Sequence, residues 1–237
     1  MAIPSPVGWA SLVEEFRRQG YVTVPGFLTP EAAGALAEAV AASPERDPGH
    51  NPLTLGTMRF ASNLFYGSPV LQAFLSSNSV VELVTTILGP DTWVRWDQAV
   101  WKHPGAPEFP MHQDNGYTNL PAEHLQLWVA LTAATADDGG LVVVPGGHRQ
   151  PLEHRWVGDH ATADVSGPRV AIEAAAGDVI AFSSYLPHAT TSNTSDHTRL
   201  AYVAEFLPLD VADPSVRLPH FVASRHGAPF GGFRDQG

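Results

Sequence analysis

Apolar residues recur at helical spacing in the first part of this chain. The pattern predicts a helix over Ser11–Gln19, with Ser11 as its N-cap and Gly20 just past its end. Residues Tyr21–Val24 then alternate as a strand does. A second helix is predicted to begin at Thr29, which is followed by proline and glutamate, and to run to about Ala42. The chain therefore opens with a helix, a short strand and a helix.

A loop and further helices follow. Residues Ser43–Thr57 are rich in proline, glycine, aspartate and asparagine, which predicts a loop and makes it a candidate lid over a site. The apolar stretch Val70–Leu88 predicts one or two helices, which end at the Gly89-Pro90 pair.

Beyond residue 91 the helical spacing gives way to short apolar or alternating runs separated by turn residues. Runs of this length and spacing predict a mainly β sandwich or barrel, with the N-terminal helices packed outside it. The predicted strands are Thr92–Lys102, Leu125–Leu131, Leu141–Val144, Val170–Ile172, Val179–Phe182 and Leu200–Leu207.

The length of 237 residues fits one large domain or at most two small ones. We expect a single domain over 1–237: a helical part with its lid over 1–91, a β core over 92–207, and a tail over 208–237. Proline and glycine are frequent from Asp210 onward, so this tail is predicted to be irregular.

Composition excludes several classes of function. With 44% hydrophobic and 16% charged residues the chain is able to form a sizeable core, and its net charge of −11 argues against a nucleic-acid partner. The absence of cysteine excludes disulfides, thiolate metal sites and cysteine nucleophiles. Residues Met1–Trp9 do not resemble a signal peptide, and no apolar run has the roughly 18 residues of a membrane span. We therefore expect a cytoplasmic protein without a membrane partner, monomeric or homodimeric.

The chain contains eleven histidines, and only His112 is followed two residues later by a carboxylate, Asp114. On an extended strand, residues i and i+2 point to the same face, so this pair is able to bind one cation. Two histidines and one carboxylate form the facial triad of non-haem iron(II) oxygenases, which leaves coordination positions open. A second histidine is therefore needed.

His188 is the best second histidine, because Arg199 follows it by eleven residues. No other histidine in the chain has an arginine ten to twelve residues downstream. A fixed guanidinium near an iron site suits bidentate capture of the distal carboxylate of a keto-diacid. The residues thus predict a metal site at His112, Asp114 and His188, with Arg199 for a co-substrate.

At this point the sequence resembles the phytanoyl-CoA dioxygenase (PhyH)-like family of iron(II)- and 2-oxoglutarate-dependent oxygenases, over nearly the whole chain. The similar segments are Phe16–Leu28, Lys102–Gly105 with Met111–Asp114, Trp128–Leu131, Gly139–Leu141, Val144–Arg149, and His188 with Asn193, Ser195 and Arg199. The family more often has serine where Gly147 stands. The resemblance implies a double-stranded β-helix, a jelly roll of the cupin type, whose mouth holds the iron.

The resemblance also implies co-substrate roles. It places Arg199 on the C5 carboxylate of 2-oxoglutarate, with Thr190 as a helper, and it places Gln98 and Trp128 in the wall of the co-substrate pocket. Lys102 matches a lysine of the family. Iron(II), 2-oxoglutarate and O2 are the implied cofactors. Halogenases of this type have glycine or alanine in place of the metal carboxylate.

Because Asp114 is present, we expect hydroxylation or another oxidation rather than halogenation. The substrate is expected to be a small metabolite or a natural-product intermediate, bound by the loop over 43–66 and the strand that faces it. Candidate contacts are Arg59, Asn63, Tyr117 and Trp156. Two alternatives remain open: a cupin-like metalloprotein that does not use 2-oxoglutarate, and a non-catalytic ligand-binding relative.

Overall fold

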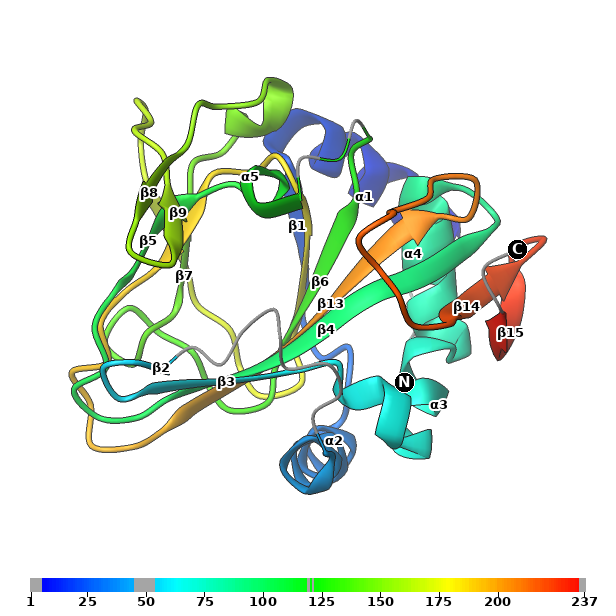
Figure 1. The fold of residues 1–237 in the computed structure, drawn as a ribbon, viewed down its shortest axis with the longest axis horizontal. Helices are drawn as coiled ribbons and strands as arrows, with labels where there is room; N and C mark the ends of the chain where they lie inside the picture. Colours follow the sequence, from blue (N-terminus) through cyan, green and yellow to red (C-terminus); the bar gives the residue numbers. More distant parts are fainter. Residues whose placement is uncertain (1–5, 45–53, 119, 121, 235–237) are drawn as a thin grey trace.

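The protein is built around a large antiparallel sheet whose two longest strands, β4 and β13, lie side by side (Figure 1). The computed structural model describes residues 6–44, 54–118, 120 and 122–234. The order along this sheet is β1-β11-β6-β13-β4-β14-β15, and β3 also pairs with β4 and carries β2. Its strands are β1 (Tyr21–Val24), β2 (Thr54–Leu55), β3 (Met58–Ser62), β4 (Thr92–Lys102), β6 (Leu125–Ala130), β11 (Val179–Ser183), β13 (Arg199–Pro208), β14 (His220–Arg225) and β15 (Ala228–Arg234).

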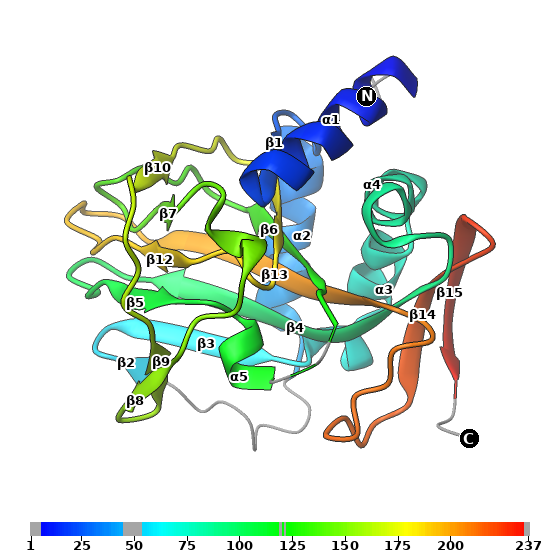
Figure 2. The ribbon, with the colours of Figure 1, turned by 90° about the horizontal axis from the view of Figure 1, so that it is seen from above.

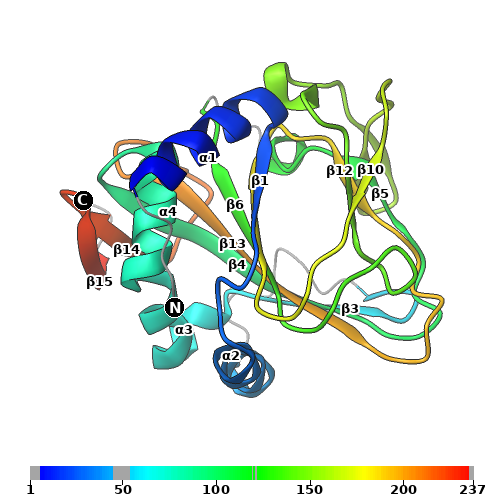
Figure 3. The same ribbon diagram turned by 180° about the vertical axis from the view of Figure 1, so that it is seen from behind.

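A smaller antiparallel sheet faces the large one, and helices cover the outer side of the large one (Figure 3). The small sheet has the order β10-β7-β12-β5, and β8 and β9 form a separate hairpin. Two facing sheets with external helices confirm the predicted cupin-like jelly roll. The strands are β5 (Phe109–His112), β7 (Leu141–Val143), β8 (Arg155–Val157), β9 (His160–Thr162), β10 (Val170–Ile172) and β12 (His188–Thr190). The helices are α1 (Pro6–Gln19), α2 (Pro30–Ala42), η2 (Leu64–Gly67), α3 (Pro69–Leu75), α4 (Asn78–Leu88), α5 (Asn115–Thr118) and η3 (Gly147–Arg149).

Strand alternation in the large sheet separates the core from the site. Along β13, Tyr202 and Phe206 belong to the apolar cluster that includes residues of α1 to α4. Arg199, Val203 and Glu205 instead line a cavity on the opposite face, between the two sheets. Because successive side chains point to opposite faces, one strand contributes to both. Burial of the apolar face provides the main driving force for packing the helices onto the sheet.

The helix-terminating and capping residues predicted from the sequence are correct at Gly20 and Thr29 and wrong at Ser11. Thr29 caps α2 by accepting a hydrogen bond from the amide of Ala32 at 3.2 Å. Gly20 follows α1 with a φ of +84°, a conformation that favours glycine. The prediction that Ser11 begins the first helix is wrong, since α1 begins at Pro6. The prediction overlooked Ser5 followed by Pro6, the same signal as Thr29 followed by Pro30, and therefore placed the start too late.

The prediction that the tail is irregular is also wrong. Strands β14 and β15 form a hairpin, and β14 pairs with β4 next to α4 (Figure 2). The segment has a glycine-rich turn and ends in the edge strand β15, so its composition resembles that of a loop. The lid loop predicted over 43–57 is also shorter than expected, because 54–55 form β2, and the longer segment 43–66 predicted to contact the substrate contains β3. Residues 45–53 of both lie outside the described part of the chain.

Within the described ranges, no single helix has the length and apolar composition needed to cross a membrane. The pair α3 and α4 passes that test only together, with a bend of 49° between them. Their apolar residues Leu71, Leu75, Val80 and Leu83 lie in the core cluster.

Tyr202 is expected to be important for stability because it forms a hydrogen bond with the buried carboxylate of Asp97. Its hydroxyl donates to Oδ2 of Asp97 at 2.6 Å, and Asp97 also accepts from the amides of Leu64 and Phe65. Burial raises the pKa of Asp97 to about 7, although these hydrogen bonds act to lower it. Tyr202→Phe is expected to lower the free energy of unfolding by about 1–3 kcal/mol.

The loss should depend on pH. The folded-state pKa of Asp97 lies above its ordinary value of 3.8, so ionisation costs the fold stability as the pH rises from about 4 to 7. Removing a donor to the carboxylate makes ionisation more costly. Urea denaturation at pH 6 and pH 8 should therefore show a larger effect of Tyr202→Phe at pH 8. An equal or smaller loss at pH 8 contradicts this account.

Candidate active site

Two histidines from neighbouring strands and one aspartate form a compact cluster at the cavity wall. The pairing of β5 with β12 places His112 directly opposite His188, and their ring centroids lie 4.2 Å apart. Oδ1 of Asp114 lies 3.3 Å from Nε2 of His112 and 3.7 Å from Nε2 of His188. One ligand atom from each residue lies within 4.8 Å of the others. Two imidazole nitrogens and one carboxylate oxygen are a suitable donor set for iron(II).

The backbone fixes both imidazoles in the orientation that metal binding requires. Nδ1 of His112 lies 2.8 Å from the carbonyl of Pro110, and Nδ1 of His188 lies 3.0 Å from that of Leu186. A carbonyl only accepts, so each Nδ1 carries the proton and each Nε2 directs its lone pair toward Asp114.

Electrostatics favour the protonation states of metal ligands at His188 and Asp114. Burial, reinforced by His112, lowers the pKa of His188 to about 4, so this imidazole is neutral at pH 7. Burial alone raises the pKa of Asp114, but the adjacent imidazoles of His188 and His112 lower it overall. A neutral imidazole beside a carboxylate is ready to bind a cation without losing a proton.

The reason these side chains meet differs from the one the sequence predicted. Strand β5 ends at His112, and Asp114 lies in the turn that leads into α5. This turn is held by Gln113, whose side-chain amide donates to the carbonyls of Gln150 and Tyr185. The prediction that the His-x-Asp pair shares one extended strand is therefore wrong, although the pair does converge.

Two buried cations lie beside the cluster on the large sheet. Arg199 and Lys102 are direct partners in the pairing of β13 with β4, and Arg199 is only 1% exposed. The Arg199 guanidinium donates to the carbonyls of Gly139 and Val100 at 3.2 and 3.3 Å, and the Lys102 ammonium donates to the hydroxyl of Thr190 at 2.9 Å. Lys102 also donates to the carbonyl of the residue after Thr190.

In the described part of the chain, no carboxylate lies within ion-pair distance of either cation. Burial and the neighbouring Arg199 lower the pKa of Lys102 to about 7, and burial lowers that of Arg199 to about 10. Two buried positive groups without a counter-ion create a strong preference for an anion at this end of the cavity.

The cavity has a volume of about 370 Å³ and extends between the two sheets. Most of the predicted contacts lie on its wall: Gln98, Trp128, Thr190, Asn63, Tyr117 and Trp156. Lys102 lies behind Thr190 rather than on the wall. Arg59 is misplaced, because it is exposed and its guanidinium lies over the ring of Trp101, 4.5 Å from the centroid, on the other face of the sheet. Trp156, at 60% exposure, forms part of the mouth.

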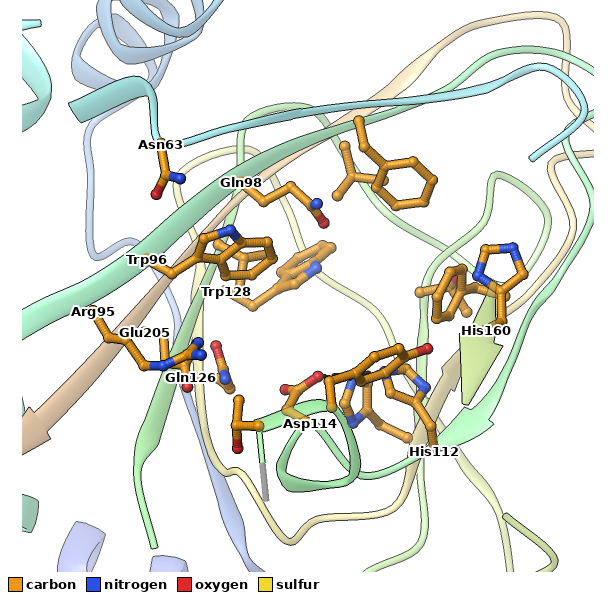
Figure 4. Close-up of a pocket in the computed structure, with 18 of the residues that line it drawn as sticks. Asn63, Arg95, Trp96, Gln98, His112, Asp114, Gln126, Trp128, His160 and Glu205 are labelled. Carbon is orange, nitrogen blue, oxygen red and sulfur yellow. Dashed lines mark hydrogen bonds and ion pairs between the residues drawn. The ribbon is translucent and has the colours of Figure 1, made fainter. Parts of the chain in front are cut away.

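The residues that line the cavity without having been singled out by the sequence include a polar group of four neighbours: Arg95, Trp96, Gln126 and Glu205. Figure 4 shows Arg95, Glu205 and Gln126 together at one end of the cavity, with His112 and His160 toward the other. Gln126 lies two residues before Trp128 on β6, so the strand's alternation was the available signal. No sequence pattern marks Arg95, whose position depends on an irregularity in β4.

The fold and this cluster define a jelly-roll protein with a two-histidine, one-carboxylate site of the non-haem iron type. The family model for phytanoyl-CoA dioxygenase (PhyH) matches residues 16–201, so the chain belongs to the PhyH family. Enzymes of this family depend on iron(II), 2-oxoglutarate and O2.

The individual relatives have low sequence identity to this chain. The chain is 32% identical over 144 residues to the phytanoyl-CoA dioxygenase of Arabidopsis thaliana, covering 56% of this chain and 51% of the relative. It is 26% identical over 154 residues to dioxygenase lolE1 of Epichloe uncinata, covering 64% and 59%. The chain thus spans little more than half the length of these relatives. The crystal structure of the epimerase SnoN, in complex with Fe3+, alpha ketoglutarate and nogalamycin RO, superposes with a TM-score of 0.74 at 24% identity, covering 97% and 99%.

Proposed function

We propose that this protein is an iron(II)- and 2-oxoglutarate-dependent oxygenase that oxidises a small molecule in natural-product metabolism. The observation that carries the proposal is the placement of the buried Arg199, with Lys102 as its strand partner, in the same cavity as the triad of His112, Asp114 and His188. A metal site alone fits many cupins, whereas a metal site beside an anion site fits a co-substrate with a distal carboxylate.

Each residue of the site has a definite role in this proposal. His112, Asp114 and His188 hold the iron on one face and leave its other positions open. Arg199 binds the C5 carboxylate of 2-oxoglutarate, and Lys102 supports it by adding positive charge and orienting the Thr190 hydroxyl. The iron, when bound, supplies the activation of O2 that no protein side chain provides.

The cavity walls orient the substrate and exclude water. Trp128, Phe182 and Val203 form an apolar lining beside Arg199, which strengthens the charge-charge attraction there. Tyr117 and Trp156, in edge-to-face contact with centroids 5.5 Å apart, cover the metal side of the mouth. A dry site of this kind protects a reactive oxidant from side reactions.

Asp114 favours hydroxylation, or another oxidation of carbon, over halogenation, since a halide needs the position that this carboxylate occupies. SnoN is described as an epimerase from nogalamycin biosynthesis, and its name supports a natural-product substrate as well as a reaction range beyond hydroxylation. A small-molecule partner is proposed on the same basis.

The two rival functions are a cupin-like metalloprotein without 2-oxoglutarate and a non-catalytic binding protein. The first has no use for a buried, unpaired Arg199, and the second has no need for correctly oriented imidazoles.

The test of the proposal needs no knowledge of the substrate. Adding iron(II) and then 2-oxoglutarate without oxygen is expected to produce a visible charge-transfer band, since a 2-oxo acid chelates the iron through its C1 carboxylate and keto oxygen. Glutarate, which lacks the keto group, is the matched control and should give no band. Iron binding without a band, or a protein that does not bind iron, overturns the proposal.

A further inference from the structure

A β-bulge places two consecutive side chains of β4 in the cavity. Glu205 on β13 is paired with Trp96, but the next residue on β13 is paired with Val94, so Arg95 is an extra residue. Successive strand residues normally point to opposite faces, whereas a bulge allows both to point the same way. Arg95 and Trp96 accordingly both line the cavity.

The partner strands complete a polar cradle around this bulge, which we define as Arg95, Trp96, Gln126 and Glu205. Glu205 pairs with Trp96 on one side and with Gln126 on the other. Directly opposite residues share a face, so the four side chains meet at one end of the cavity (Figure 4). None of them belongs to the metal cluster or to the anion site.

The positive charge of Arg95 is already neutralised. Its Nη1 donates to Oε2 of Glu205 at 2.9 Å, and its Nε donates to Oδ2 of Asp213 at 2.5 Å. The remaining Glu205 oxygen lies 2.6 Å from Nε2 of the buried His124. Two carboxylates thus lie against Arg95, and one of them also contacts His124, so the cradle carries no excess positive charge.

The charged residues at the mouth of the cavity do not change this balance of charge. Arg217 and Asp159, both exposed, line it with one charge of each sign. An anionic substrate group would have to displace Glu205 or Asp213 from Arg95 to gain a full ion pair. The cradle is therefore suited to a neutral group, in contrast to the anion site at Arg199.

Gln126 is an acceptor that lacks a donor. It is 1% exposed, it lines the cavity, and its Oε1 has no hydrogen-bond partner among the residues that the structure describes. A buried unpaired polar atom costs free energy, so a ligand that donates a hydrogen bond to it binds with a clear advantage. The second nitrogen of the guanidinium, Nη2 of Arg95, makes no hydrogen bond within the described chain and is available as a donor.

We propose that the cradle is the substrate-specificity site and that it selects a neutral ring bearing adjacent hydroxyl groups. One hydroxyl donates to Gln126 Oε1, a neighbouring oxygen accepts from Arg95 Nη2, and the ring packs on the face of Trp96. The inference rests on the proposed oxygenase function, since it assigns the substrate half of the same cavity. It distinguishes hydroxylated rings from carboxylates and phosphates.

The test uses a matched pair of probes that differ in charge: 4-nitrophenyl β-D-glucopyranoside, which is neutral, and 4-nitrophenyl β-D-glucuronide, which is anionic. Both are offered to the 237-residue chain loaded with iron(II) and 2-oxoglutarate without oxygen, and the dissociation constants are measured by equilibrium dialysis. We expect the glucoside to bind at least about tenfold more tightly than the glucuronide, because the glucuronide brings a carboxylate into a cradle whose positive charge is already paired.

Two variants at Gln126 separate its hydrogen bond from its bulk. Gln126→Leu is expected to weaken glucoside binding about tenfold, and Gln126→Met, which keeps the length of the side chain but has no acceptor oxygen, should weaken it to a similar extent. Gln19→Leu, the same change on α1 and away from the cavity, is the control and should have no effect.

The charge-transfer band of each variant shows that iron and 2-oxoglutarate are still bound, so this readout tests the proposed function independently. With the band intact, equal binding of both probes, binding of neither probe, or normal glucoside binding by Gln126→Leu overturns the inference and leaves the oxygenase assignment standing. Absence of the band in the parent protein refutes the oxygenase assignment itself.

Discussion

Replacing Asp114 by alanine is expected to abolish 2-oxoglutarate turnover. Oδ1 of Asp114 is the atom that faces both Nε2 atoms, at 3.3 and 3.7 Å, so its removal leaves two imidazoles and no negative ligand. Loss of an outer partner of a metal ligand already costs about 10–100-fold in metal affinity or activity, so loss of a ligand should cost more than about 100-fold. Succinate release and the iron content per chain are the measurements.

The chain offers a close control for this variant. Asp164 also forms an ion pair, with Arg155 at 2.7 Å, but both side chains are exposed and lie outside the cavity lining. Asp164→Ala should therefore keep full iron content and full turnover. If Asp114→Ala retains turnover, or if both variants lose it equally, the metal assignment of this carboxylate is wrong. His112→Ala is expected to behave as Asp114→Ala does.

The parts of the fold that the sequence predicted well are those with a strong repeating pattern. The strand of residues 92–102 was predicted at its observed bounds, and β10 likewise, because their ends coincide with turn residues. The second helix was predicted from the capping threonine and the proline that follows it. These are local signals, which one segment carries by itself.

The missed elements depend on partners elsewhere in the chain. Strands β14 and β15 are recognisable only once β4 supplies an edge for β14, and β3 is a strand because it pairs with residues 98–102. Short segments of this kind have little intrinsic preference, so their tertiary partners determine their structure. The tail was therefore predicted as irregular.

The same distinction applies to the site. His112, Asp114, His188 and Arg199 were found because their types and spacing carry chemical meaning, and the structure brings all four to one cavity. Arg95 was missed because a bulge has no sequence signature, and Gln126 because a glutamine in a strand is ordinary until its surroundings are known. Arg59 was wrongly included, since alternation along β3 turns it to the opposite face from Met58 and Phe60.

Replacing Arg199 in the anion site is expected to weaken 2-oxoglutarate binding strongly. Arg199→Gln is expected to raise the dissociation constant for 2-oxoglutarate about 100-fold, the cost of removing one partner from a buried charge pair. Turnover at saturating 2-oxoglutarate should change far less, because Arg199 binds the end of the molecule remote from the iron. Titration of the charge-transfer band gives the dissociation constant, and succinate release gives the turnover.

A co-substrate that lacks the distal carboxylate tests whether Arg199 binds that carboxylate. 2-Oxopentanoate keeps the chelating end of 2-oxoglutarate but has no charge for Arg199 to bind. The parent protein should prefer 2-oxoglutarate strongly, and Arg199→Gln should lose most of that preference, while Arg155→Gln, a change at an exposed arginine, should keep it. Such a cycle isolates the interaction between one guanidinium and one carboxylate. An unchanged preference in Arg199→Gln means that the C5 carboxylate binds elsewhere, and Lys102, the buried strand partner of Arg199, is then the group to replace.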